Sequence, residues 1–200
     1  MTLSRSQVVL ASASPARRRL LEAAGLKVVV TPHTVDEGTV KEAVGDSDPA
    51  DLAMILAHAK ALSVSEANPS ALVVGADQVL SLDGRIFNKP ASREEAREQL
   101  LDLRGQRHTL ISAVACATGG AVVWSQDSEA QLTMRAFSTD FLGAYLAALD
   151  DKVMESAGGY QLEGFGAQLF EHIEGDYFTI LGLPLLPLLG FLRSEHILLT

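Results

Sequence analysis

The arrangement of short apolar runs limits the fold more than any other feature of this chain. Residues 7–11, 27–31 and 71–76 are mostly apolar and are predicted as strands, and segments with helical capping signals separate them. Strands that alternate with helices pair in parallel through crossover connections. Asp83-Gly84 and Gly119-Gly120 instead predict tight hairpins, which join antiparallel strands. The two kinds of connection together predict an α/β fold on a mixed β-sheet.

Capping residues indicate where the helices begin and end. Ser14 followed by Pro15 predicts a helix start, and Gly25 predicts its end. Three further helices are predicted from their capping residues. The first spans 49–67 and begins after Ser47 or Asp48. The second begins after Ser92, with Glu95 completing the capping box, and ends near 103; the third begins after Ser138 and ends near 149.

The remaining segments are predicted as loops, short strands and one buried helix. Residues 34–46 are polar and contain glycine, so we expect a loop, and the Gly-rich stretch 158–166 is also read as a loop or loop-helix. Residues 71–76 and 79–82 are read as separate strands, which places Asp77 at the end of the first. Residues 180–192 are read as a loop and a buried helix.

Composition limits the classes of partner. The chain has 200 residues, no internal repeat and no linker, so we expect one domain over 1–200. Its net charge of -9 argues against a large surface for nucleic acid, although a local basic cluster could bind a small anion.

Cysteine usage and hydropathy indicate a compartment. Cys116 is the sole cysteine and lies in an apolar stretch, so we expect a buried structural thiol, not a catalytic one. A chain without an internal disulfide suits the cytoplasm. Residues 180–192 are too few to span a bilayer and include Pro184 and Pro187, and no signal peptide is evident, so no membrane association is expected.

The helix start at Ser14 carries a possible phosphate site. Arg17 and Arg18 fall in its first turn, where cations oppose the helix dipole and a bound anion would reverse that effect. A solvated basic turn is the alternative. Because Arg17→Ala takes a cation away from the helix N-terminus, we expect it to stabilise the free protein slightly, by at most ~1 kcal/mol.

Two carboxylates and two lysines are the other candidates for catalysis or for binding a metal or a phosphate. Asp77 could hold a divalent ion or accept a proton, or it could simply bond to the turn that follows. Glu37, in Val35-Asp36-Glu37, could be a metal partner or solvated surface. Lys60 could meet a phosphate or extend to solvent from a helix edge, and Pro90 holds Lys89 extended.

Other catalytic patterns are missing from the sequence. The five histidines show no metal-ligand spacing, and there is no Walker A, Gly-x-Gly-x-x-Gly or Gly-x-Ser-x-Gly motif. A kinase or nucleotidyltransferase is therefore disfavoured.

Taken in order, these motifs resemble the Maf family over residues 7–193. The resemblance rests on a series of motifs in this order: Leu10-Ala11-Ser12-Ala13-Ser14-Pro15-Ala16-Arg17-Arg18, Val35-Asp36-Glu37, Ala57-His58-Ala59-Lys60-Ala61, Gly75-Ala76-Asp77-Gln78, Asp83-Gly84, Lys89-Pro90, Gly158-Gly159-Tyr160, Glu163-Gly164-Phe165-Gly166, Ile173-Glu174-Gly175-Asp176-Tyr177 and Gly182-Leu183-Pro184.

The resemblance implies a fold and an activity. It implies a Maf/ITPase-like α/β domain with a central cleft, commonly a homodimer, which hydrolyses a nucleoside triphosphate between its α and β phosphates. The products would be a nucleoside monophosphate and pyrophosphate, and a divalent cation, Mg²⁺ or Mn²⁺, would be required. The alternative is a non-enzymatic nucleotide-binding regulator of septum formation. The enzyme is favoured because a binding module has no need of a general base.

The resemblance also implies roles for particular residues. Asp77 would be the general base and Glu37 its partner in holding metal or water, while Lys60 and Lys89 act in catalysis by neutralising the triphosphate. The implied substrate-binding residues are Ser12, Ser14, Ala16, Arg17, Arg18, Gln78 and Glu163. Gln at position 78 and Glu at position 163 resemble the residues found in the subgroup that acts on 7-methyl-GTP. Two residues depart from the family pattern. At position 16 this chain has Ala where that subgroup tends to carry Trp, and at position 88 it has Asn where the family commonly has Gly.

Overall fold

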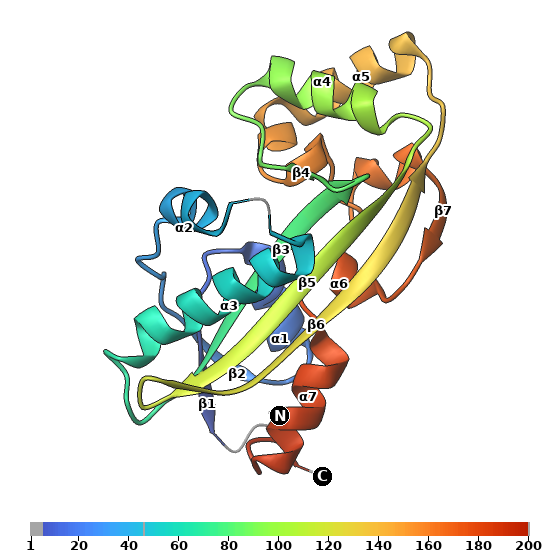
Figure 1. The fold of residues 1–200 in the computed structure, drawn as a ribbon. Helices are drawn as coiled ribbons and strands as arrows, with labels where there is room; N and C mark the ends of the chain where they lie inside the picture. The colour runs from blue at the N-terminus through green and yellow to red at the C-terminus, as the bar shows by residue number, and fades with distance from the viewer. Residues whose placement is uncertain (1–5, 46, 200) are drawn as a thin grey trace. The chain divides into compact units, whose positions relative to one another are not determined.

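The computed structural model describes residues 6–45 and 47–199, and the chain divides into two compact units. The first unit holds the residues up to Gln78, Ile111–Ser128 and the residues from Tyr177 onward; the second holds Val79–Leu110 and Glu129–Asp176. Within the described residues, seven strands form one sheet in the order β2-β1-β3-β5-β6-β7, with β4 paired to β3 (Figure 1). The long strands β3 (Leu72–Leu82), β5 (Arg107–Thr118) and β6 (Ala121–Met134) contribute residues to both units.

The first unit begins with a parallel strand–helix–strand arrangement. Strand β1 (Gln7–Leu10) pairs in parallel with β2 (Lys27–Val30) and with β3. Helix α1 (Pro15–Ala23) is the crossover between β1 and β2, and the Ser14 side chain accepts a hydrogen bond from the Arg17 amide at its start. Helix α3 (Pro49–Ser65) precedes β3 and is capped by Asp48. These elements confirm the strands and helices predicted from the capping residues.

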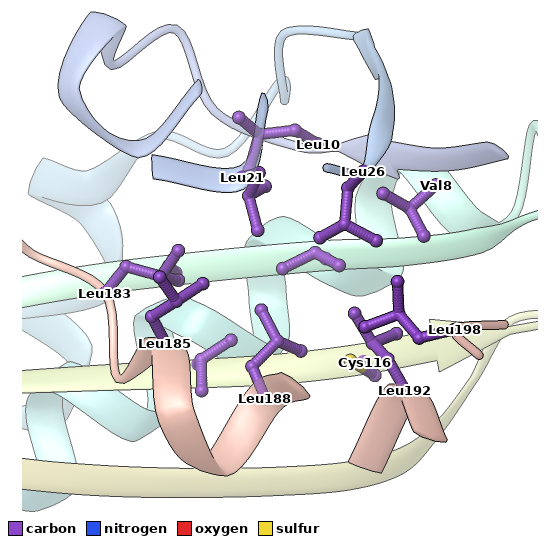
Figure 2. Packing of buried hydrophobic residues seen from close by; sticks show 13 residues of the cluster. Val8, Leu10, Leu21, Leu26, Cys116, Leu183, Leu185, Leu188, Leu192 and Leu198 are labelled. Carbon is purple, nitrogen blue, oxygen red and sulfur yellow. The ribbon is translucent and has the colours of Figure 1, made fainter. Parts of the chain in front are cut away.

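Alternation along the strands gives the sheet of the first unit two different faces. One face packs Val8, Leu10, Val74 and Ala76 against α1 and α7 (Leu185–Ser194). Figure 2 shows this cluster, with Leu192 of α7 beside Cys116 of β5. Successive strand residues point to opposite faces, so Val9, Ala11 and Val73 pack with Val64 of α3 on the other side.

The second unit contains the predicted hairpin and two predicted helices. The chain turns from β3 into β4 (Arg85–Phe87) at Asp83 and Gly84, whose φ angles are 51° and 83°. Positive φ at both central residues is the geometry of a type I′ turn, which explains the Asp-Gly pair. Helices α4 (Arg93–Leu103) and α5 (Thr139–Leu149) begin after Ser92 and Ser138, as predicted. Short 3-10 turns occupy Asp150–Met154, Ala157–Gly159 and Phe165–Leu169.

Several elements differ from the sequence prediction. Residues 37–44, predicted as loop, form helix α2 (Glu37–Val44), because the Asp36 side chain accepts from the Gly38 and Thr39 amides and caps it. Residue 46 of that predicted loop lies outside the described residues. Strand β3 runs without a break through Asp77, and β7 (Phe170–Glu174), which pairs antiparallel with β6, was not predicted.

The C-terminal part and the cysteine follow the sequence prediction. The loop and α7 are as predicted, and Leu185, Leu188 and Leu192 of α7 are buried; the short helix α6 (Tyr177–Ile180) before them was not predicted. Cys116 is buried, and burial raises the pKa of its thiol to about 12, which makes it unreactive. Across residues 6–45 and 47–199, no helix is long and apolar enough to cross a membrane. Parallel and antiparallel pairs in one sheet confirm the α/β class.

Candidate active site

The ammonium of Lys60 lies between the two carboxylates that were predicted to be catalytic. Its Nζ atom donates to Asp77 Oδ1 at 2.6 Å and lies 2.7 Å from Glu37 Oε1. Lys60 comes from α3, Asp77 from β3 and Glu37 from the first position of α2. Three segments that are separate in sequence therefore meet at one charged group.

A close approach between α3 and β3 brings Lys60 to Asp77. A Cβ atom added to Gly75 would lie 2.5 Å from both Ala57 O and Ala61 N of the helix, far inside van der Waals contact. Glycine at this position thus lets the helix backbone lie directly on the strand. Asp77 is two residues further along β3 and therefore points to the same face, toward the helix.

Burial distinguishes the members of this group. Lys60 and Asp77 are only 3% and 7% exposed, whereas Glu37 is partly open to solvent. From the sequence, the Lys60 side chain could have extended to solvent from the edge of its helix. Its burial excludes that interpretation. Burial by itself would raise the pKa of Glu37, but the hydrogen bond and charge of Lys60 outweigh it and leave that pKa lowered. Glu37 is therefore ionised at neutral pH.

His33 lies next to the same group and was assigned no role from the sequence. Its Nε2 atom is 3.9 Å from Glu37 Oε1. Burial, and after it the charge of Lys60, lowers the pKa of His33, so the imidazole is neutral near pH 7. No spacing pattern in the sequence indicates this contact, because the loop after β2 and the start of α2 create it.

Arg17 is bonded to the protein at three points. Its Nε donates to Gly182 O at 2.8 Å, and its Nη1 donates to Ala76 O at 2.8 Å and to Ser12 Oγ at 3.2 Å. Burial lowers the pKa of this guanidinium, while the charges of Asp77 and Glu37 act in the opposite direction. Arg17 ties the loop after β1 to β3 and to the loop before α7. Its predicted contact with phosphate stays a prediction.

Gln78 lies on the sheet face opposite to Asp77. Its Nε2 atom is 3.0 Å from Ser112 Oγ and from the carbonyl oxygens of Thr179 and Ile180. Ser112 is fully buried and also donates to Thr179 O at 2.7 Å. Gln78 and Ser112 thus hold the α6 segment against β3 and β5. Sequence adjacency grouped Gln78 with Asp77, but alternation along β3 separates their side chains.

The other predicted residues of the first unit surround the start of α1. Ser12 is buried and bonded to Arg17, and Ser14 is the helix cap. Ala16 is partly buried in the first turn. Arg18 is exposed and pairs with Glu22 one turn later at 2.8 Å, on the helix surface. The two arginines, equivalent by sequence, therefore have different surroundings.

Lys89 and Glu163 belong to the second unit. That they act on the substrate together with Asp77 and Glu37 stays a prediction. Both are exposed. The loop that carries Lys89 is held by Gln99, whose Nε2 donates to Asn88 O at 3.0 Å. The loop that carries Glu163 folds tightly, since a Cβ added to Gly166 would collide with the Gln161 backbone.

Asp77 and Glu37 have the right donor chemistry for a hard divalent cation. Carboxylate oxygens suit Mg²⁺ and Mn²⁺. Among residues 6–45 and 47–199, no group of three or more His, Cys, Asp or Glu side chains could hold a metal. Two carboxylates are nevertheless a common protein contribution to a Mg²⁺ site, because waters and substrate phosphates supply the other ligands.

The sequence matches the model of a known protein family. The model of the Maf family, described as "Maf-like protein", matches residues 7–195, so the chain belongs to the Maf family. A nucleoside triphosphate pyrophosphatase from Bradyrhizobium diazoefficiens is 51% identical, over 97% of this chain and 96% of the relative. A 7-methyl-GTP pyrophosphatase from Mesorhizobium japonicum is 50% identical, over 94% and 96%. A nucleoside triphosphate pyrophosphatase from Granulibacter bethesdensis is 47% identical, over 96% and 98%.

A solved structure is more distantly similar. The nucleoside-triphosphatase / dITP/XTP pyrophosphatase from Mycobacterium abscessus is 18% identical over 96% of this chain and 94% of that chain, with a TM-score of 0.43.

Proposed function

We propose that the protein is a hydrolase that cleaves nucleoside triphosphates between the α and β phosphates, giving a nucleoside monophosphate and pyrophosphate. The observation that carries the proposal is the Glu37–Lys60–Asp77 group, where a buried ammonium and two carboxylates converge. Family membership and relatives about half identical, named as pyrophosphatases of this kind, support it. The enzyme clears particular nucleotides from the pool.

In this proposal the residues of the first unit perform distinct tasks. Asp77 accepts a proton from the attacking water, which turns the water into a stronger nucleophile. Lys60 neutralises negative charge that develops on the phosphates, and it is already buried where water cannot screen it. Arg17 keeps the loop after β1 in place through its three bonds to the protein. Lys89 supplies a further positive charge.

A divalent cation belongs to the proposal. Asp77 and Glu37 would hold Mg²⁺ or Mn²⁺, which when bound stabilises charge on the leaving pyrophosphate. A homodimer and a cytoplasmic location, where nucleotide pools are found, complete the proposal; the lone buried cysteine suits a reducing compartment. No nucleic acid is expected as a partner, in keeping with the net charge of -9.

Analysis of the products tests the bond that is cut. The purified protein is incubated with a panel of nucleoside triphosphates and Mg²⁺ or Mn²⁺, and the products are separated by chromatography. A monophosphate with pyrophosphate is expected. A diphosphate with orthophosphate as the main products would reject the proposed reaction, and no hydrolysis of any nucleotide would favour a non-enzymatic regulator.

Asp77→Asn tests the proposed base. Asparagine keeps the size of the side chain but cannot accept the proton, so turnover should fall by about 10²–10⁴-fold. Asp83→Asn is the matched control, because Asp83 is exposed in the β3–β4 turn and asparagine tolerates its φ of 51°. Circular dichroism checks that both variants fold. Turnover near the wild-type rate in folded Asp77→Asn would remove Asp77 from the mechanism.

A further inference from the structure

The Lys60 ammonium occupies the space between the two carboxylates that are proposed to hold the metal. Its Nζ atom is 2.6 Å from Asp77 Oδ1 and 2.7 Å from Glu37 Oε1, so one cation bridges both side chains. These are short, charge-assisted contacts. The lysine is only 3% exposed, so it cannot exchange these partners for solvent without moving.

A divalent cation bound to the same carboxylates would compete with this ammonium. Bound alone, it would leave Lys60 buried, next to a doubly charged ion and without an anionic partner, which is costly. A triphosphate changes that balance, because its oxygens offer Lys60 new anionic partners at the moment the metal takes the carboxylates. Among the described residues, no group of three or more His, Cys, Asp or Glu side chains could hold the metal more firmly.

We propose that Lys60 is the resident counter-ion of the Asp77–Glu37 pair and makes metal binding depend on the triphosphate. This inference rests on the metal-dependent function proposed above. The free protein binds metal weakly, and the metal joins the site together with the nucleotide. Because coupling between two ligands is reciprocal, the metal strengthens nucleotide binding by the same factor. The two carboxylates stay paired in the free protein, which avoids an uncompensated buried charge.

Calorimetric titrations measure this coupling without any turnover. Mn²⁺ is titrated into wild-type protein alone and into protein saturated with α,β-methylene-GTP, which cannot be cleaved between the α and β phosphates. Inorganic tripolyphosphate replaces the nucleotide in a parallel series, so the result does not depend on the base. We expect Mn²⁺ to bind at least tenfold more tightly with either polyphosphate. Equal affinity with and without them would overturn the proposal.

Variants of Lys60 identify the cause of the coupling. Lys60→Met removes the competing charge, so Mn²⁺ alone should bind at least tenfold more tightly than to wild type, and the gain from polyphosphate should shrink. Lys60→Arg keeps the charge and should bind Mn²⁺ alone as weakly as wild type. Lys27→Met, at the exposed first residue of β2, is the matched control and should behave as wild type.

The outcomes are decisive in each case. Mn²⁺ affinity in Lys60→Met at or below the wild-type value, or a Lys60→Arg variant that behaves like Lys60→Met, would overturn the proposal. If Lys60→Met folds only when Mn²⁺ is added, the metal has replaced the missing counter-ion, as expected. If it folds under neither condition, the wild-type titrations decide. Failure of the hydrolysis assay would reject the proposed function while leaving these binding results intact, so the two ideas fail separately.

Discussion

Arg17 and Arg18 are adjacent in sequence, yet the structure gives them different surroundings. If both were solvated, each would oppose the dipole of α1, and removing Arg17 would stabilise the protein slightly. Arg17 instead donates to Gly182 O, Ala76 O and Ser12 Oγ, and we expect these charge-assisted bonds to outweigh the dipole effect. These bonds count against the expected slight stabilisation, which is tested by the variants below.

Alanine substitutions at the two positions check this difference. Arg17→Ala leaves buried carbonyl groups without their charged donor, so we expect a loss of roughly 1.5–3 kcal/mol in the free energy of unfolding. Arg18→Ala removes only an exposed pair with Glu22 and should change it by less than about 1 kcal/mol. Urea titrations at pH 7 measure both. Equal effects would contradict the role assigned to Arg17.

His108 links stability to pH. The residue is 1% exposed, its Nε2 lies 2.8 Å from the Tyr160 hydroxyl, and burial lowers its pKa from 6.5 to about 4. Above pH 6.5 the imidazole is neutral in both the folded and the unfolded state, so it contributes no pH dependence. Between about pH 6.5 and 4, only the unfolded state takes up the proton, so stability falls as pH falls.

Replacement of His108 should remove that part of the acid sensitivity. The shift corresponds to a loss on the order of 3 kcal/mol across this pH range. His108→Gln can still bond to Tyr160 but does not titrate, so its free energy of unfolding should fall less between pH 7 and 4. His196→Asn, at an exposed histidine with φ of 57°, should keep the wild-type profile. Identical profiles for wild type and His108→Gln would contradict this assignment.

At the scale of elements, the contact between α3 and β3 positions the site. Gly75→Ala places a methyl group against Ala57 O and Ala61 N, which are backbone atoms that cannot move independently of the helix. The helix must shift, which costs about 1–3 kcal/mol and disturbs the Lys60–Asp77 pair. We expect lower stability and reduced turnover in the same variant.

A second glycine provides the control for this element. Gly143 lies inside α5 with no atom within 4 Å of an added Cβ. Gly143→Ala should therefore stabilise the helix by roughly 0.5–1 kcal/mol and leave turnover unchanged. Thermal unfolding and steady-state kinetics are measured for both variants. Full activity in Gly75→Ala would show that the close approach does not position Lys60.

Elements that depend on interactions between neighbouring residues were mostly predicted correctly, whereas features that depend on residues far away in the sequence were not. Helix α1 and the β3–β4 hairpin depend on neighbouring residues, so Ser14-Pro15 and Asp83-Gly84 predicted them correctly. Asp77 was taken as a strand end because its neutralising partner, Lys60, is 17 residues away. Helix α2 was missed because its Asp36 cap stands in a polar segment whose composition is typical of loops.

The same distinction applies to the candidate site. The motif series identified Glu37, Lys60 and Asp77, and the structure brings these three together. Sequence could not reveal that Arg17 is bonded to Gly182 or that Gln78 faces Thr179, because the partners are more than 100 residues away. The contact of His33 with Glu37 was likewise invisible, since it depends on the fold of the loop between β2 and α2.

At the scale of the whole molecule, the open question is which base the enzyme prefers. Relatives of nearly equal identity carry the general name and the 7-methyl-GTP name, so relatedness alone does not choose. Glu163 gives a physical reason to expect a modified purine. Guanine has two N–H donors on its Watson–Crick edge, which one carboxylate can accept, whereas uracil and thymine place one donor between two carbonyls.

Competition between nucleotides tests this preference. We expect higher kcat/KM for GTP and 7-methyl-GTP than for dTTP and UTP, because the positive charge of a methylated base favours Glu163 further. Glu163→Gln should move activity toward pyrimidines, whereas Glu171→Gln, at an exposed residue of β7, should not. Ala16→Trp should sharpen the preference for 7-methyl-GTP, since an aromatic ring on a cationic base contributes about 0.5–2 kcal/mol. Wild-type protein that hydrolyses dTTP or UTP far faster than both purines would reject this reading of Glu163.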